Sequence, residues 1–276
     1  MAADNKTSSV TIAESTLTVE NRVATLTFER DDVRNALTGT ALCDDILAAI
    51  AWANGNTDVS VLIITGAGKA FSSGGDVKAM RDKAGMFAGT PSEIEREYRT
   101  GIQRVPVAVH SAEVVTIAAV NGPAIGAGCD LACMCDLRLG SEAAAFGETF
   151  VNLGIIPGDG GAWFLQRLIG YQRAADMTFR GRIVRAPEAQ EIGLLLEVVE
   201  PAKLRARAQE LATEIAAKPP QALRYAKRLM KLAQRTELPD FLDYCAALQS
   251  FSHGTEDHAE AMAAFLDKRE PNYTGR

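Results

Sequence analysis

The sequence contains only three histidines, His110, His253 and His258. Histidine is the most frequent general base in enzymes and a common metal ligand. His253 and His258 are five residues apart, so they do not share one helix face as ligands at positions i and i+4 do. We therefore expect neither a histidine-centred catalytic triad nor a histidine metal site.

Cysteines are also few, and their number is odd: Cys43, Cys129, Cys133, Cys135 and Cys245. An odd count in a chain without an export signal predicts reduced thiols rather than a disulfide framework. The C-x3-C-x-C spacing of the central three cysteines fits no common zinc pattern. We expect buried structural thiols and no metal.

The chain has no uninterrupted apolar run of membrane-spanning length, since Asn121, Pro123 and Asp130 break its most apolar stretch. The first residues, MAADNKTSSV, are polar and no apolar segment follows them, which predicts a cytoplasmic protein. Positive charge is in deficit, with a net charge of −6. This disfavours a nucleic-acid or anionic-membrane surface but leaves room for local basic pockets that bind phosphates.

The remaining composition is that of an ordinary globular protein, with 47% hydrophobic and 23% charged residues among 276. Strand and helix patterns alternate to about residue 200, and only helical patterns follow Pro201. Alternating units predict an α/β fold. We expect a core over residues 1–200 and a helical C-terminal region over residues 201–276.

The expected elements follow from hydrophobic periodicity and from glycine or proline at their ends. The expected strands are a hairpin within 16–29 and buried runs at 59–68, 114–122, 136–141 and 194–200. The expected helices are 38–54, 92–105, 161–170, 171–181, 186–193, 202–217, 220–235, 238–252 and 255–269. Residues 85–91 are expected to form a mobile loop.

Two glycine-rich turns, GAGKAFSSGGD at 66–76 and NGPAIGAGCD at 121–130, each follow a buried strand and precede a helix. The first lacks the spacing of a phosphate-binding P-loop, and the second lacks the third glycine of a dinucleotide fingerprint. Two such turns facing each other would aim two backbone N–H groups at one oxygen, as in an oxyanion hole for an enolate. Ordinary tight turns, in which glycine supplies a positive φ, are the alternative.

The segments AFSSGGDVKAM and VTIAAVNGPAIGAGCDLACMCDLRLGSEAAAFGETFVNLGIIPGDGGAWFLQRLIG resemble the paired signatures of the crotonase superfamily, the enoyl-CoA hydratase/isomerase family. RNAL at 34–37 and the C-terminal FLDKREPNYTGR resemble it as well. The resemblance implies a crotonase-like ββα spiral core with a C-terminal helical trimerisation region, in a homotrimer or a dimer of trimers. It implies an acyl-CoA thioester substrate and no cofactor apart from the coenzyme A that the substrate carries.

The resemblance also assigns roles to particular residues. The backbone N–H groups of Ser73 and Ala127 would form the oxyanion hole. The CoA and acyl channel would be lined by Arg34, Ala36, Leu37, Ser73, Gly74, Gly75, Asp76 and Phe150. Lys268 or Arg269 would reach the CoA phosphates from a neighbouring subunit, or both would be a solvated helix end.

The two glutamates that hold the water in typical hydratases fall on Asp130 and Phe150 of this chain. One acid is therefore shorter by a methylene and the other is absent. Phenylalanine cannot transfer a proton, and general acid–base catalysis contributes about 10²–10⁴-fold. An aromatic wall would instead dry the pocket and raise the pKa of a neighbouring carboxyl.

Glu148, Asp159 and Asp130 are the candidate proton carriers. Glu148 lies two residues before Phe150, so in extended backbone both point to the same side, or else Glu148 is a surface carboxylate. Asp159 follows the position at which isomerase relatives carry their acid, and its alternative role is to cap the helix at Gly160. Asp130 either carries a proton, or caps or forms a salt bridge at the start of its helix.

The leading hypothesis is an enzyme that stabilises a thioester enolate, an enoyl-CoA hydratase or isomerase of fatty-acid or related acyl-CoA metabolism. Its alternatives are acyl-CoA hydrolysis or decarboxylation on the same site, and an acyl-CoA-binding protein without catalytic activity.

Overall fold

The structure, a computed structural model, describes residues 10–276 and centres on a six-stranded sheet with the spatial order β1-β2-β3-β4-β6-β9. Neighbouring strands run parallel except for the β1–β2 hairpin. The strands are β1 (Ser15–Glu20), β2 (Val23–Phe28), β3 (Val61–Gly66), β4 (Val115–Val120), β6 (Leu137–Ser141) and β9 (Glu197–Val199). Residues 1–9, on which the expectation about the polar start of the chain falls, lie outside the described residues.

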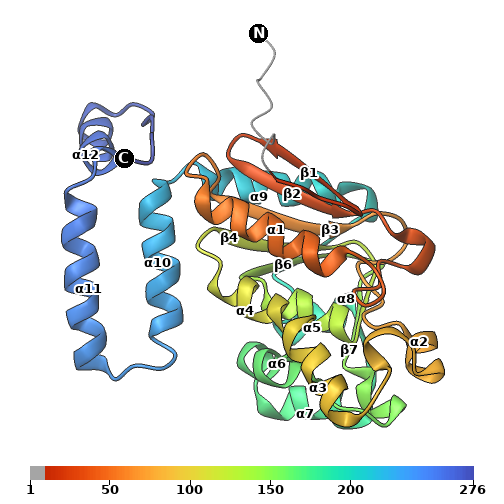
Figure 1. Cartoon of the computed structure of the whole chain (residues 1–276). Helices are drawn as coiled ribbons and strands as arrows, with labels where there is room; N and C mark the ends of the chain where they lie inside the picture. The colour runs from red at the N-terminus through yellow and green to blue at the C-terminus, as the bar shows by residue number, and fades with distance from the viewer. Residues whose placement is uncertain (1–9) are drawn as a thin grey trace.

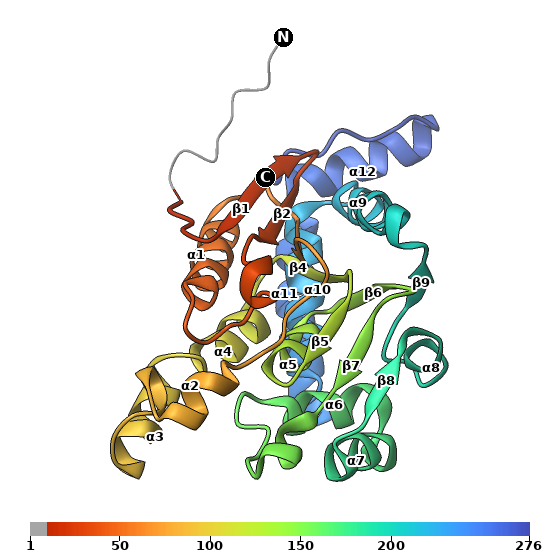
Figure 2. The same cartoon turned by 90° about the vertical axis from the view of Figure 1, so that its right-hand side faces the viewer.

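Helices cover both faces of this sheet, which is why its central strands read as continuous apolar runs. Alternate residues of β3 point to opposite faces. Leu62 and Ile64 pack in the cluster that includes α1 (Leu42–Gly55), and Val61 and Ile63 pack against α9 (Leu204–Ala216). The two helices lie on opposite sides of the sheet (Figure 2).

A second, three-stranded sheet stands beside the first in the order β5-β7-β8. Its strands have three residues each, β5 (Pro123–Ile125), β7 (Ala145–Gly147) and β8 (Ile183–Arg185). The elements around it are α5 (Ala127–Met134), the 3-10 helix η3 (Thr149–Leu153), α6 (Gly161–Ile169), α7 (Tyr171–Arg180) and α8 (Ala186–Glu191). The sequence did not predict this sheet, although it predicted α6, α7 and α8.

An excursion between β3 and β4 contains more helices than expected. It comprises α2 (Val77–Asp82), the 3-10 helix η2 (Gly85–Phe87), α3 (Pro91–Thr100) and α4 (Arg104–Ser111), and a further 3-10 helix, η1 (Asp31–Val33), follows β2. The helix expected over 92–105 is in fact two helices that meet near Gly101. The segment expected as a loop at 85–91 includes η2.

The C-terminal helices α10 (Pro220–Leu232), α11 (Leu238–His253) and α12 (Glu256–Asp267) stand away from the sheet (Figure 1). In contrast, α9 and the 3-10 helix η4 before it (Pro201–Lys203) belong to the body, because Leu204, Ala208 and Ala212 are buried against the sheet. The predicted division at residue 200 therefore falls before α9, whereas the segment that leaves the body begins at Pro220. None of the helices within residues 10–276 is both long and apolar enough to span a membrane.

Candidate active site

The two glycine-rich turns lie against each other. Ser72 and Ala124 form a parallel β-bridge, and the Ile125 N–H donates to the Ser72 carbonyl at 3.0 Å. Gly74 has a φ of +80°, and a Cβ placed on it would overlap the Ile125 carbonyl and lie 2.9 Å from the Ala127 nitrogen. Only glycine permits this approach, which brings the first turn to the N-terminus of α5.

The hydrogen bonds of these turns decide which N–H groups remain free. The Ser73 N–H donates to the Arg34 carbonyl at 2.9 Å, so it is occupied. The Gly74 N–H donates to Ser72 Oγ at 3.1 Å. Within residues 10–276, the N–H groups of Gly75 and Ala127 donate to no acceptor, and Ala127 is the first residue of α5. The predicted donor Ser73 does not fit this arrangement, and Gly75 takes its place as the candidate beside Ala127.

The segment 34–37 is brought to the same turns, as predicted for the channel residues. The Leu37 N–H donates to the Gly74 carbonyl at 2.7 Å, and Ala36 pairs with Gly74 in a β-bridge. Ala36 and Leu37 are buried. Asp76 has a structural task at this place, since its carboxylate accepts from the N–H groups of Lys78 and Ala79 at the start of α2.

Two carboxyl groups meet at the N-terminus of α6. Asp130, in the first turn of α5, and Glu148, between β7 and η3, are both fully buried. The Gly161 N–H donates to Asp130 Oδ2 at 3.1 Å. A Cβ on Gly161 would overlap both Asp130 Oδ1 and Glu148 Oε1, so both oxygens lie beside this one backbone position. The surface position considered for Glu148 is therefore wrong.

The protonation of this pair is set by burial. Burial and the neighbouring Glu148 carboxyl raise the pKa of Asp130 well above its usual range. Burial raises the pKa of Glu148 to about 7, although a hydrogen bond with Asp130 opposes the increase. Two adjacent buried carboxylates repel each other strongly, so the pair holds a shared proton near neutral pH.

Asp159 is the third carboxyl, in the loop immediately before α6. It is buried, and its Oδ1 atom has no hydrogen-bond partner within residues 10–276. The helix-capping role considered for Asp159 is wrong, because the N-cap residue of α6 is Gly160 and the first N–H of the helix donates to Asp130 instead. Burial raises the pKa of Asp159 to about 6, so most of it is ionised at neutral pH.

Asp130 has neither of the two structural roles considered for it, a salt bridge or a cap at the start of its own helix. It forms no salt bridge within residues 10–276, and it does not cap its own helix. Instead it accepts from the first N–H of a different helix, α6, whose N-terminus favours negative charge. In the described part of the chain, no group of three or more His, Cys, Asp or Glu residues is arranged to hold a metal ion.

A family model described as enoyl-CoA hydratase/isomerase matches residues 18–276. The chain belongs to this family.

Several members are similar over nearly the whole chain. A probable enoyl-CoA hydratase of Mycobacterium tuberculosis is 36% identical, covering 93% of this chain and 96% of that protein. A crotonyl-CoA hydratase of Syntrophomonas wolfei is 34% identical over the same shares of the two chains. The crystal structure of an enoyl-CoA hydratase from Bacillus anthracis superimposes with a TM-score of 0.88 at 32% identity, covering 96% of this chain and all of the other. The crotonase fold and the acyl-CoA enzyme class are thereby established.

Phe150 occupies the position at which the resemblance to typical hydratases places the second glutamate. It lies in η3 and is buried. Its ring atoms Cε1 and Cζ lie 3.6 Å from the position of a Cβ on Gly126, the residue that precedes α5. An aromatic ring therefore lies beside the N-terminus of α5, where Ala127 is the first residue.

Lys268 is not brought to this site in its own chain. It is exposed and ends α12 in a left-handed conformation with φ of 53°. In both views α12 lies on the side of the molecule opposite α2 and α3 (Figures 1 and 2). A contact between Lys268 and CoA would therefore require a second subunit.

Proposed function

We propose that the protein adds water to the double bond of a 2-enoyl-CoA thioester. The observation that carries this proposal is the arrangement of three buried carboxyl groups beside two free backbone N–H groups. The thioester oxygen would accept from the N–H groups of Gly75 and Ala127, which stabilise the negative charge of the enolate. The names of the hydratase relatives support hydration as the reaction.

The acid pair Asp130 and Glu148 supplies both proton transfers of this reaction. A carboxylate of the pair takes one proton from water as the hydroxyl oxygen bonds to C3. The protonated carboxyl of the pair gives its proton to C2, where the enolate forms. The pair ends with the proton it began with, so no further reactant is needed. Glu148 thus replaces the acid that is missing at Phe150.

Double-bond isomerisation is the second candidate, and the position of Asp159 favours it. Asp159 lies in a different loop from the acid pair and is mostly ionised at neutral pH. A lone carboxylate of this kind can remove a proton at one carbon and return it to another. The Phe150 ring beside Ala127 disfavours water in that part of the pocket.

We also propose a homotrimer or a dimer of trimers, in a cytoplasmic location. Large apolar side chains on the outer surfaces of α11 and α12 support the assembly. Phe251, Phe265 and Leu266 are exposed by 65%, 79% and 72% in the single chain. An apolar surface of this kind is typical of protein–protein contacts.

To test the two candidate reactions, purified protein is mixed with crotonyl-CoA and, in a separate assay, with a 3-enoyl-CoA. The absorbance of the conjugated thioester is followed in both assays. Loss of absorbance with crotonyl-CoA is expected for hydration, and a gain with the 3-enoyl-CoA for isomerisation. Asp130→Asn should reduce hydration by about 10²–10⁴-fold, and Asp159→Asn should reduce isomerisation selectively. No change with either substrate, across chain lengths, would refute both reactions and leave hydrolysis, decarboxylation or simple acyl-CoA binding.

A further inference from the structure

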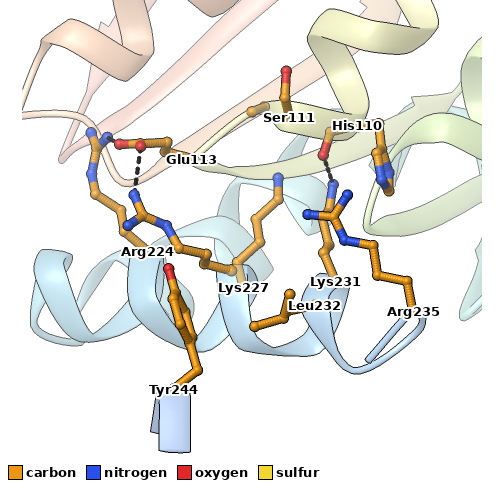
Figure 3. A pocket seen from close by; sticks show the side chains of 11 residues that line it. His110, Ser111, Glu113, Arg224, Lys227, Lys231, Leu232, Arg235 and Tyr244 are labelled. Atoms are coloured by element: carbon orange, nitrogen blue, oxygen red, sulfur yellow. Dashed lines mark hydrogen bonds and ion pairs between the residues drawn. The ribbon is translucent and has the colours of Figure 1, made fainter. Parts of the chain in front are cut away.

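A cavity that is lined by none of the three acids Asp130, Glu148 and Asp159 lies between the end of α4 and the helix α10. Its volume is about 460 Å³, within the range of small-ligand sites. It is lined by His110, Ser111, Ala112, Glu113, Arg224, Lys227, Arg228, Lys231, Leu232, Arg235 and Tyr244 (Figure 3). We call this cavity the α10 pocket.

Positive charge is concentrated in the α10 pocket, although the whole chain has a net charge of −6. Five of its lining residues are lysine or arginine, and Glu113 is the one acidic lining residue. Glu113 pairs with Arg224 at 3.1 Å and with Arg228 at 2.9 Å. Asp136, which lines an adjoining cavity, lies 2.6 Å from Lys227 and 3.8 Å from Lys231. Two carboxylates therefore face five cations.

Two of these cations have a structural task that accounts for them. The Arg224 guanidinium donates to the carbonyls of Ala53, Asn54, Asn56 and Val59 near the end of α1. Lys227 Nζ donates to the Val114 carbonyl as well as pairing with Asp136. Both residues are buried, and together they fasten α10 to the body.

The cations at the other end of the α10 pocket have fewer acceptors. Lys231 donates to the His110 carbonyl, and the Arg235 guanidinium has no acceptor within residues 10–276. Both side chains approach the His110 ring (Figure 3). Burial and the neighbouring Lys227 lower the pKa of Lys231 to about 8. The Asp136 carboxylate, 3.8 Å from Lys231, opposes this decrease without cancelling it.

An apolar cavity of about 450 Å³ adjoins the α10 pocket and shares His110, Lys227 and Lys231 with it. The shared residues join a basic compartment to an apolar one. The apolar walls come from α5, α6 and α10 and include Met134, Trp163, Phe164, Leu168, Leu223 and Met230. A ligand that fills both compartments would have an anionic group and an apolar or aromatic part.

We propose that the α10 pocket binds an organic phosphate, with the phosphate group held by Arg228, Lys231 and Arg235. A group with two negative charges matches several converging cations, whereas one arginine suffices for a carboxylate. The apolar or aromatic part of the ligand lies in the adjoining cavity, against Trp163 and Met230. This site is separate from the acid residues of the proposed reaction, so its test does not depend on catalysis.

Calorimetric titration of the full-length protein with 1-naphthyl phosphate and with pyrophosphate tests this proposal. Both should bind at low salt, and binding should weaken as salt is raised. Naphthyl phosphate should bind more tightly, because its ring enters the apolar cavity. Arg235→Gln should weaken both by about tenfold or more, since a charge-assisted hydrogen bond is lost. Arg205→Gln, the same change at an exposed position of α9, should leave both affinities unchanged.

Competition with free CoA identifies the source of the phosphate. Displacement of naphthyl phosphate from the α10 pocket would assign the site to the phosphates of CoA, and its retention would assign it to a separate phosphate metabolite. The proposal is overturned if neither probe binds the wild type or if Arg235→Gln binds as tightly as Arg205→Gln. It is also overturned if Arg235→Gln changes the oligomeric mass, since an acidic segment of a second subunit would then be the occupant.

Discussion

Glu148 and Asp130 place two carboxyl groups at one buried position, and no cation within residues 10–276 pairs with either. Burial of an unpaired charge costs free energy, so a buried carboxyl without a cationic partner tends to bind a proton and become neutral. An arrangement that costs stability and has no structural partner is more typical of a catalytic site than of a core. Apart from the hydrogen bond with Asp130, the buried Glu148 carboxyl has no hydrogen-bond partner within residues 10–276.

Glu148→Gln should change how stability depends on pH. The folded-state pKa of Glu148 is about 7, above the ordinary value of 4.5. A carboxyl with a raised pKa stabilises the fold fully below its unfolded-state pKa, and this stabilisation is lost as the pH rises through its folded-state pKa. Relative to the variant, wild type should lose roughly 1–3 kcal/mol in the free energy of unfolding between about pH 4.5 and pH 7.5.

Urea unfolding of both proteins across this pH range provides the measurement. Glu191→Gln is a suitable control, because Glu191 is exposed and the change in charge is the same. That control should run parallel to wild type. Parallel curves for wild type and Glu148→Gln would mean that Glu148 titrates normally in the folded protein.

Ala127→Pro should remove one oxyanion donor while it preserves the helix. Proline is well tolerated at the first position of a helix, because the N–H that it lacks has no intrahelical acceptor there. Ala127 occupies that position in α5. The expected loss is about 10²–10³-fold in kcat for crotonyl-CoA. Unchanged circular dichroism and CoA binding would separate this effect from misfolding, and a wild-type rate would exclude Ala127 as a donor.

The sequence predicted the three acids that the structure buries close to the start of α6, but not all of their surroundings. The spacing to the glycine-rich turns and the resemblance to the family pointed to Asp130, Asp159 and Ala127. The choice of Gly75 over Ser73 as the donor was not predictable, because it depends on the hydrogen bond of the Ser73 N–H to the Arg34 carbonyl in a distant segment. The burial of Glu148 depends in the same way on α6, which begins beside it.

Among the elements, α6 organises the site through its first residue. Gly161 donates to Asp130 and has no space for a side chain between the two carboxyl groups. Gly160 before it has a φ of +105°, which turns the chain into the helix. The loop that carries Asp159 and the helix that contacts the acid pair are therefore fixed by the same two glycines.

Gly161→Ala should push the acid pair apart. Overpacking in a filled core typically costs about 1–3 kcal/mol of stability, and we expect hydration to fall by an order of magnitude or more because catalytic groups tolerate little displacement. Gly55→Ala at the end of α1 is the matched control, since no atom lies within 4 Å of its added Cβ. Thermal melting and the crotonyl-CoA assay measure the two effects. Equal behaviour of both variants would show that the acids can move aside without consequence.

The short strand β9 was predicted as the end of a longer apolar run at 194–200, but most of the predicted elements are long enough to show a hydrophobic period. The six-residue strands β2, β3 and β4 and the helices α9 to α12 are of this kind. The strands β5, β7 and β8 have three residues each, too few for an alternating pattern. Their pairing depends on contacts between distant segments, and this second sheet is what places η3 and α6 beside α5.

For the whole molecule, helical periodicity does not reveal which helix covers a sheet. The segments α9 and α10 both read as amphipathic helices from the sequence. Ala208, Ala212 and Ala216 give α9 a small-residue face that packs on the sheet, whereas α10 is held mainly through Arg224 and Lys227. The apolar residues of α11 and α12 remain uncovered in a single chain and support the proposed oligomer.

Replacement of Phe265 and Leu266 by aspartate should dissociate this oligomer. Both side chains project from α12 with 79% and 72% of their surface exposed in the single chain. Burial of one such side chain at an interface is worth about 1.5–3 kcal/mol, and two buried charges would oppose association further. Light scattering after gel filtration should give three or six chains per particle for wild type and one for the double variant. Ala206→Asp, which adds a charge to the exposed surface of α9, should keep the wild-type mass.

A double variant that keeps the wild-type mass would show that the subunits associate through another surface. Lys268, two residues after Leu266, would then lie too far from that contact to reach CoA in a neighbouring subunit.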